Sequence, residues 1–85
     1  MYIIKIHYVA TDANPNFKGQ TQDWYEGKGT TALSQNEFPP QWMISEYGYK
    51  TLSGAKKGLQ AVERNCEFEN RYGYWTATAE LIQVN

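Results

Sequence analysis

Polar and apolar residues alternate along the first segment of the chain, from Tyr2 to Val9. On an extended backbone one face carries Tyr2, Ile4, Ile6 and Tyr8, and the other carries Ile3, Lys5, His7 and Val9. A period of two in β-branched and aromatic residues predicts a strand with one face on the core. The turn-forming residues from 11 to 16 predict that the strand ends there.

The middle of the chain carries weaker signals. We predict a short strand from Gln22 to Gly27, a turn at Gly27–Gly29, and a loop from Thr30 to Pro40 because that stretch has no clear period. A third strand is predicted from Gln41 to Tyr49, where the side chains alternate between two mixed faces.

The segment from Thr51 to Cys66 has the only clear helical pattern. Apolar residues recur at steps of three and four and form a single stripe: Leu52, Ala55, Leu59, Val62 and Cys66. Thr51 is the expected N-cap, with Ser53 as the alternative.

Alternation returns from Tyr74 to Val84 and predicts the last strand, with a bulge at Leu81-Ile82 where the register slips. The predicted order is therefore β-β-β-α-β. We expect a single α+β domain over residues 1–85: an antiparallel sheet of three to four strands with one helix packed on one face.

Composition narrows the classes of function. The 85 residues carry a formal net charge of -1, which excludes a polybasic nucleic-acid arm and a strongly charged membrane-surface protein. A single cysteine excludes an internal disulfide framework and a cysteine-based zinc site, so we expect a cytoplasmic protein. No apolar run approaches the roughly 20 residues that a membrane span needs.

The third predicted strand and the helix resemble a known family. Ser45-Glu46-Tyr47-Gly48-Tyr49 leads into Gly54-Ala55, Gly58-Leu59, Val62 and Asn65. This stretch resembles the strand-to-helix signature of the YegP-like family of small bacterial proteins of unknown function, although Tyr47 is an extra residue. The resemblance implies a helix lying on an antiparallel sheet, and it transfers no catalytic residues. In size the chain is also similar to small phage or mobile-element proteins.

Two residues with catalytic chemistry lack the partners that catalysis requires. His7, the only histidine, lies beside Lys5 on the mixed face of its strand, with no acid nearby in the sequence. Cys66 ends the apolar stripe at the C-terminal end of the helix, where the dipole disfavours a thiolate. We therefore expect no enzyme, no catalytic residue and no cofactor.

Three other motifs have structural explanations. Gly27-Lys28-Gly29-Thr30-Thr31 lacks the spacing of a phosphate-binding loop and is interpreted as a turn. Gly54 and Gly58, one helical turn apart, indicate a close approach of another segment: packing within the monomer, or a groove or dimer contact. Glu63, Glu67 and Glu69 form a small acidic cluster around the helix end, in which Glu63 and Glu67 could share a face; the cluster is interpreted as solvated surface, so no metal site is expected.

The aromatic residues exceed what one face of a small sheet can bury against one helix. Exposed aromatic surface marks binding sites, and alternation sends about half of these rings to the open face of the sheet. The candidate partner-binding residues are Trp24, Tyr25, Trp42, Tyr47, Tyr49, Tyr72 and Tyr74. The alternative is a second layer, in which the loops over residues 11–20 and 30–40 cover these rings.

These features favour a non-enzymatic module that binds another protein, such as an inhibitor or accessory factor of a phage or mobile element. The alternative is single-stranded nucleic-acid binding by base stacking on the open sheet face, although the acids cancel the bases here. Strand addition at an open sheet edge would instead give a homodimer.

Overall fold

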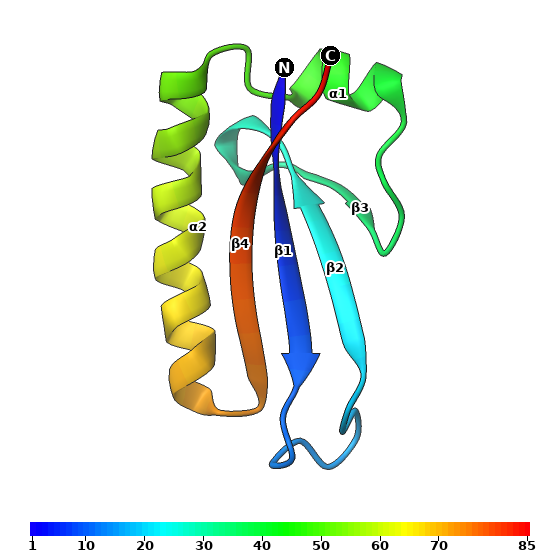
Figure 1. The fold of residues 1–85 in the computed structure, drawn as a ribbon, viewed down its shortest axis with the longest axis vertical. Coiled ribbons are helices and arrows are strands. Elements are labelled where there is room, and N and C mark those ends of the chain that lie inside the picture. Colours follow the sequence, from blue (N-terminus) through cyan, green and yellow to red (C-terminus); the bar gives the residue numbers. More distant parts are fainter.

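The alternating segment at the start of the chain forms β1 (Tyr2–Ala10), which lies between two antiparallel partners in a four-stranded sheet (Figure 1). The computed structural model describes residues 1–85. The other strands are β2 (Thr21–Glu26), β3 (Ala32–Gln35) and β4 (Trp75–Gln83), and the strand order is β3-β2-β1-β4. The predicted α+β fold with an antiparallel sheet is confirmed.

The long helix α2 (Leu52–Tyr72) covers one face of the sheet, as predicted. Thr51 is its N-cap, because the Thr51 hydroxyl accepts a hydrogen bond from the Gly54 N–H at 3.1 Å. The helix runs beyond the predicted end at Cys66 and ends at Gly73, which adopts the left-handed conformation (φ 80°) that glycine tolerates best. The extension places residues 67–72 on the helix.

The predicted third strand from Gln41 to Tyr49 is wrong. Its first seven residues form a short helix, α1 (Gln41–Tyr47), and Tyr49 makes only an isolated bridge with Tyr2. The physical reason is that Ile44 is the only buried residue in this helix, so one helical turn suffices to bring it onto the sheet. The Gly48 N–H donates to the Ile44 carbonyl at 2.8 Å and ends the helix.

The third strand comes from the segment predicted as a loop. β3 follows the short 3-10 turn η1 (Lys28–Thr30) and pairs with β2 at the edge of the sheet. Leu33 is its one buried residue, which explains why the sequence of this segment shows no hydrophobic period.

The predicted bulge at Leu81-Ile82 is also wrong, since β4 pairs with β1 in continuous register. The irregular pairing occurs instead between Tyr25 and Glu26, where β2 pairs with β3.

Each face of the sheet has its own core. Under α2 the buried residues are Ile4, Ile6, Val62, Cys66 and Ala77. On the opposite face α1 helps to bury a second set: Ile3, Tyr25, Leu33 and Ile44. The two sets use alternate residues of β1, so Ile3 and Ile4 pack on opposite sides.

The helical glycines serve packing within the monomer. A Cβ atom at Gly58 would overlap the hydroxyl and ring of Tyr49, so this position admits no side chain without a shift of the ring. Tyr49 in turn packs against the core under α2.

The molecule is elongated, about 39 Å in its longest dimension. Both termini lie beside α1 at one end, while the β1–β2 loop (residues 11–20) and the α2–β4 turn lie at the other (Figure 1). No helix has the length and hydropathy needed to cross a membrane.

Candidate functional site: an aromatic groove beside the long helix

The seven aromatic residues predicted to bind a partner do not share one open sheet face. Tyr25 is buried in the second core (7% exposed), and Tyr49 is half-buried against Gly58. Trp42 and Tyr47 are exposed on α1, at the end of the molecule that carries the termini. The other three, Trp24, Tyr72 and Tyr74, lie toward the opposite end.

The open part of the sheet, beyond α1, is polar rather than aromatic. Lys5, His7 and Val9 project there from β1, flanked by Asp23 of β2 and by Thr78 and Glu80 of β4. The expected open aromatic face is therefore wrong. Tyr25 is buried in one core with Ile44 of α1 and packs edge to face on Phe38 of the preceding loop, and the side chain of Trp24 lies on the face that carries α2.

An acid does stand beside His7, contrary to the sequence analysis. His7 Nδ1 lies 2.6 Å from Asp23 Oδ1, on neighbouring strands that pair these two residues directly. Both side chains are partly exposed, so the pair is solvated and contributes little to stability. Sixteen residues of sequence separate the two, and only the strand register brings them together.

The β1–β2 loop is fastened to the α2–β4 turn by hydrogen bonds. Asn14 is buried, and its side-chain oxygen accepts the N–H groups of Asn16 (3.2 Å) and Phe17 (3.1 Å). Its amide nitrogen donates to the carbonyl of Tyr74 at 3.3 Å. The backbone N–H of Thr11 donates to the same carbonyl at 3.0 Å, and the Thr11 hydroxyl donates to the Gly73 carbonyl. Two loops that are distant in sequence thus form one fixed surface.

An aromatic groove lies on this surface. Its outer part has a volume of about 500 Å³, is open to solvent, and is lined by Asn14, Pro15, Asn16, Phe17, Glu69, Tyr72, Tyr74 and Trp75. Its inner part continues between α2 and β2 and is lined by Tyr8, Gln22, Trp24, Glu69 and Trp75. We call these two connected parts the aromatic groove.

The rings of the groove support one another. Trp75 packs against Phe17 with ring centroids 5.7 Å apart, and its other neighbour is Tyr8, edge to face at 6.2 Å. On α2, Phe68 packs edge to face on Tyr72 at 5.1 Å. Tyr72 is 65% exposed and Tyr74 51% exposed. Large aromatic surface therefore faces solvent along the outer groove.

Negative charge accompanies the rings. Glu69 lines both parts of the groove, and Glu26 follows Trp24 on the same face of β2. Burial raises the pKa of Tyr8; interaction with Cys66, once that thiol is ionised, and with the negative charges of Glu69 and Glu26 raises this pKa further. Burial also raises the pKa of Glu26. The groove is thus both aromatic and acidic.

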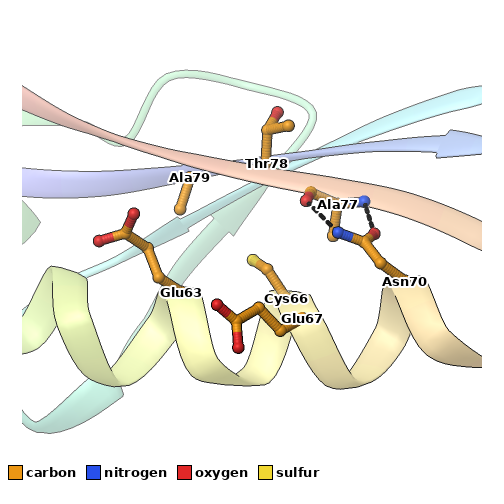
Figure 2. A pocket seen from close by; sticks show the side chains of 7 residues that line it. All are labelled: Glu63, Cys66, Glu67, Asn70, Ala77, Thr78 and Ala79. Carbon is orange, nitrogen blue, oxygen red and sulfur yellow. Dashed lines mark hydrogen bonds between the residues drawn. The ribbon is translucent and has the colours of Figure 1, made fainter.

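A second pocket lies on the other side of α2, at the free edge of β4 (Figure 2). The side-chain oxygen of Asn70 accepts a hydrogen bond from the Ala77 N–H at 2.7 Å, and its amide nitrogen donates to the Ala77 carbonyl at 3.3 Å. Asn70 thereby occupies the edge position that an added strand would use. The Cys66 side chain points toward the sheet between Glu63 and Asn70.

Cys66 is a buried free thiol, as expected. Burial raises its pKa, and the carboxylates of Glu26, Glu63 and Glu69 raise it further. The thiol is therefore protonated at neutral pH and is a poor nucleophile. No group of three or more His, Cys, Asp or Glu side chains is arranged to hold a metal ion.

Comparison of the chain with protein-family models, curated proteins and solved structures finds no match. The resemblance to the YegP-like family therefore stays a prediction.

Eight of the eleven residues that line the groove were not predicted as site residues, among them Tyr8, Phe17, Glu69 and Trp75. A signal existed for two of them. Phe17 is a large apolar residue in a stretch of turn formers, and Glu69 follows Cys66 by three positions, which places it beside the buried stripe of a longer helix. Tyr8 was placed on the core face of its strand and Glu69 in a solvated acidic cluster; both are half-buried, as is Trp75.

Proposed function

We propose that this chain is a non-enzymatic module that binds another protein through the aromatic groove. The observation that carries the proposal is the combination of exposed rings with a fixed backbone at the same end of the molecule. Trp and Tyr are enriched among the residues that dominate interface energetics. Because Asn14 already fixes the loop, binding would cost little ordering of that segment.

The open shape of the groove favours a segment of a protein chain as the occupant. Both parts are open to solvent, and together they run from the β1–β2 loop to β2, so a segment of chain fits better than an enclosed small molecule. The rings present apolar faces and hydroxyl groups together, which suits a partner surface of mixed polarity.

Single-stranded nucleic acid is a weaker candidate for the same surface. Its bases could stack on the exposed rings of Tyr72 and Tyr74, but the carboxylate of Glu69 lies between the two parts of the groove. Glu69 repels phosphate, and neutralisation of phosphates supplies most of the affinity of such proteins.

The test is capture from a lysate of the encoding organism on the immobilised chain, compared among three forms of the chain. These are the wild type, the double variant Tyr72→Ala/Tyr74→Ala, and Trp42→Ala as a matched control. Trp42 is as exposed as Tyr72 (65% each) but lies on α1, near the opposite end. All three changed residues are at least half exposed, so both variants should fold, which circular dichroism verifies.

We expect the wild type and Trp42→Ala to retain the same protein, with and without nuclease. The double variant should retain about tenfold less, as loss of interface aromatic residues usually causes. Equal retention by the double variant contradicts the proposal, and loss of the protein after nuclease treatment favours nucleic acid instead. The identity of the retained protein decides whether the role is that of an inhibitor or accessory factor.

A further inference from the structure

Glu69 is a half-buried carboxylate with no cationic partner in its own chain. It lies where the two parts of the groove meet, beside Tyr8, Trp24 and Trp75 in the inner part. The only ion pair within 4.0 Å is that of His7 with Asp23, on the opposite face of the sheet. The Glu69 carboxylate is therefore free to accept charge-assisted hydrogen bonds from a cation that an occupant of the groove brings.

The surroundings of Glu69 suit one kind of cation. Aromatic faces attract cations through their quadrupoles, most strongly when the site is partly desolvated. A guanidinium group is planar, so it stacks on a ring while donating two hydrogen bonds to a carboxylate. The inner groove offers the indoles of Trp24 and Trp75 beside the carboxylate of Glu69.

The charge on the same face extends this complementarity. Glu26 follows Trp24 on β2 and is likewise half-buried with no cation within 4.0 Å. Glu26 lines neither part of the groove; it adds negative charge on the same face, and Glu69 is the carboxylate that an occupant meets.

We propose that the inner part of the aromatic groove binds an arginine side chain of the partner protein, stacked among Tyr8, Trp24 and Trp75 and paired with Glu69. This proposal rests on the proposed function, and it adds the chemistry that the partner must present. The exposed rings of Tyr72 and Tyr74 then contact apolar residues next to that arginine.

The experiment uses two blocked tripeptides, Leu-Arg-Leu and Leu-citrulline-Leu, titrated to millimolar concentration into the ¹⁵N-labelled chain. Citrulline keeps the planar shape of arginine and removes its charge. The indole N–H signals report the place of binding, because Trp24 and Trp75 line the groove whereas Trp42 lies on α1. The titration is repeated with Glu69→Gln and with Glu67→Gln, whose carboxylate lines the pocket on the other side of α2.

We expect the arginine peptide to shift the Trp24 and Trp75 signals and to leave Trp42 unchanged. Its affinity should exceed that of the citrulline peptide by about tenfold, as expected for a charge-assisted pair among aromatic rings. Glu69→Gln should abolish the difference between the peptides, and Glu67→Gln should preserve it.

Equal affinity of the two peptides for the wild type overturns the inference, as does a preference for arginine that survives Glu69→Gln, or the absence of any shift at Trp24 and Trp75. These outcomes leave the proposed function standing if the captured protein still depends on Tyr72 and Tyr74. Failure of that capture would instead refute the proposed function itself.

Discussion

The side-chain oxygen of Asn14 accepts the backbone N–H of Phe17 at 3.1 Å, and this bond places Phe17 against the ring of Trp75. Asn14 is the only buried polar residue of the chain, and it also donates to the Tyr74 carbonyl in the facing turn. The shape of the groove therefore depends on a residue that makes no stacking contact itself.

Asn14→Ala should weaken both the fold and the groove. The change leaves the N–H groups of Asn16 and Phe17 and the carbonyl of Tyr74 without their side-chain partner, at a cost of about 1–3 kcal/mol in the free energy of unfolding. Urea denaturation measures the loss. Asp12→Ala, an exposed change in the same loop, is the control and should shift the midpoint little. Equal midpoints for the two variants would show that Asn14 does not hold the loop.

Gly58→Ala should destabilise the chain, although alanine is the better helix former. The higher helix propensity of alanine stabilises the folded state by about 1 kcal/mol. The added methyl group overlaps the Tyr49 ring, however, and such overpacking costs about 1–3 kcal/mol in the free energy of unfolding. A double-mutant cycle with Tyr49→Leu separates the two effects. In the Tyr49→Leu background Gly58→Ala should become neutral or stabilising. The same loss in both backgrounds would refute the proposed contact.

Asn70→Ala should lower stability by about 1–2 kcal/mol, because two hydrogen bonds to the backbone of Ala77 are lost. It should also promote self-association, since the freed edge of β4 can accept another strand. Light scattering at increasing concentration measures the second effect. Asn65→Ala, an exposed asparagine on the same helix, controls for helix propensity and should leave the chain unassociated. If both variants associated, the claim that Asn70 protects the free edge of β4 would be refuted.

Glu26 should make stability depend on pH. Burial raises the pKa of Glu26 in the folded state above its ordinary value of 4.5, so the folded chain binds this proton more tightly than the unfolded chain. The resulting contribution to stability is complete below pH 4.5 and is lost as the pH rises through the folded pKa. Glu26→Gln should therefore raise the melting temperature at pH 7, and this gain should shrink toward pH 4. A gain that is equal at both pH values would contradict the raised pKa.

The sequence predicted the elements whose signals are local. The alternation in residues 2–9 and the stripe from Leu52 to Cys66 each report one buried face, and Thr51 caps the helix through a contact three residues away. Residues 41–47 and 32–35 contribute a single buried side chain each, Ile44 and Leu33, so neither segment has a period to detect.

The site was harder to predict because it depends on contacts that are distant in the sequence. Strand register alone joins His7 to Asp23, and the meeting of two turns joins Phe17 to Trp75. Tyr25 was assigned to an open face because α1, which brings Ile44 into the core around Tyr25, was interpreted as a strand, and because Phe38, which packs on its ring, is distant in the sequence. Tyr72 and Tyr74 were predicted as partner-binding residues and are exposed, and whether they bind a partner stays a prediction.

The most direct test of the aromatic groove as the binding surface is a spectrum of the ¹⁵N-labelled chain with the unlabelled captured protein added. We expect the indole N–H signals of Trp24 and Trp75 to shift or broaden while that of Trp42, on α1, is unchanged. A response confined to Trp42 would contradict the account and place the interface at the end of the molecule that carries the termini.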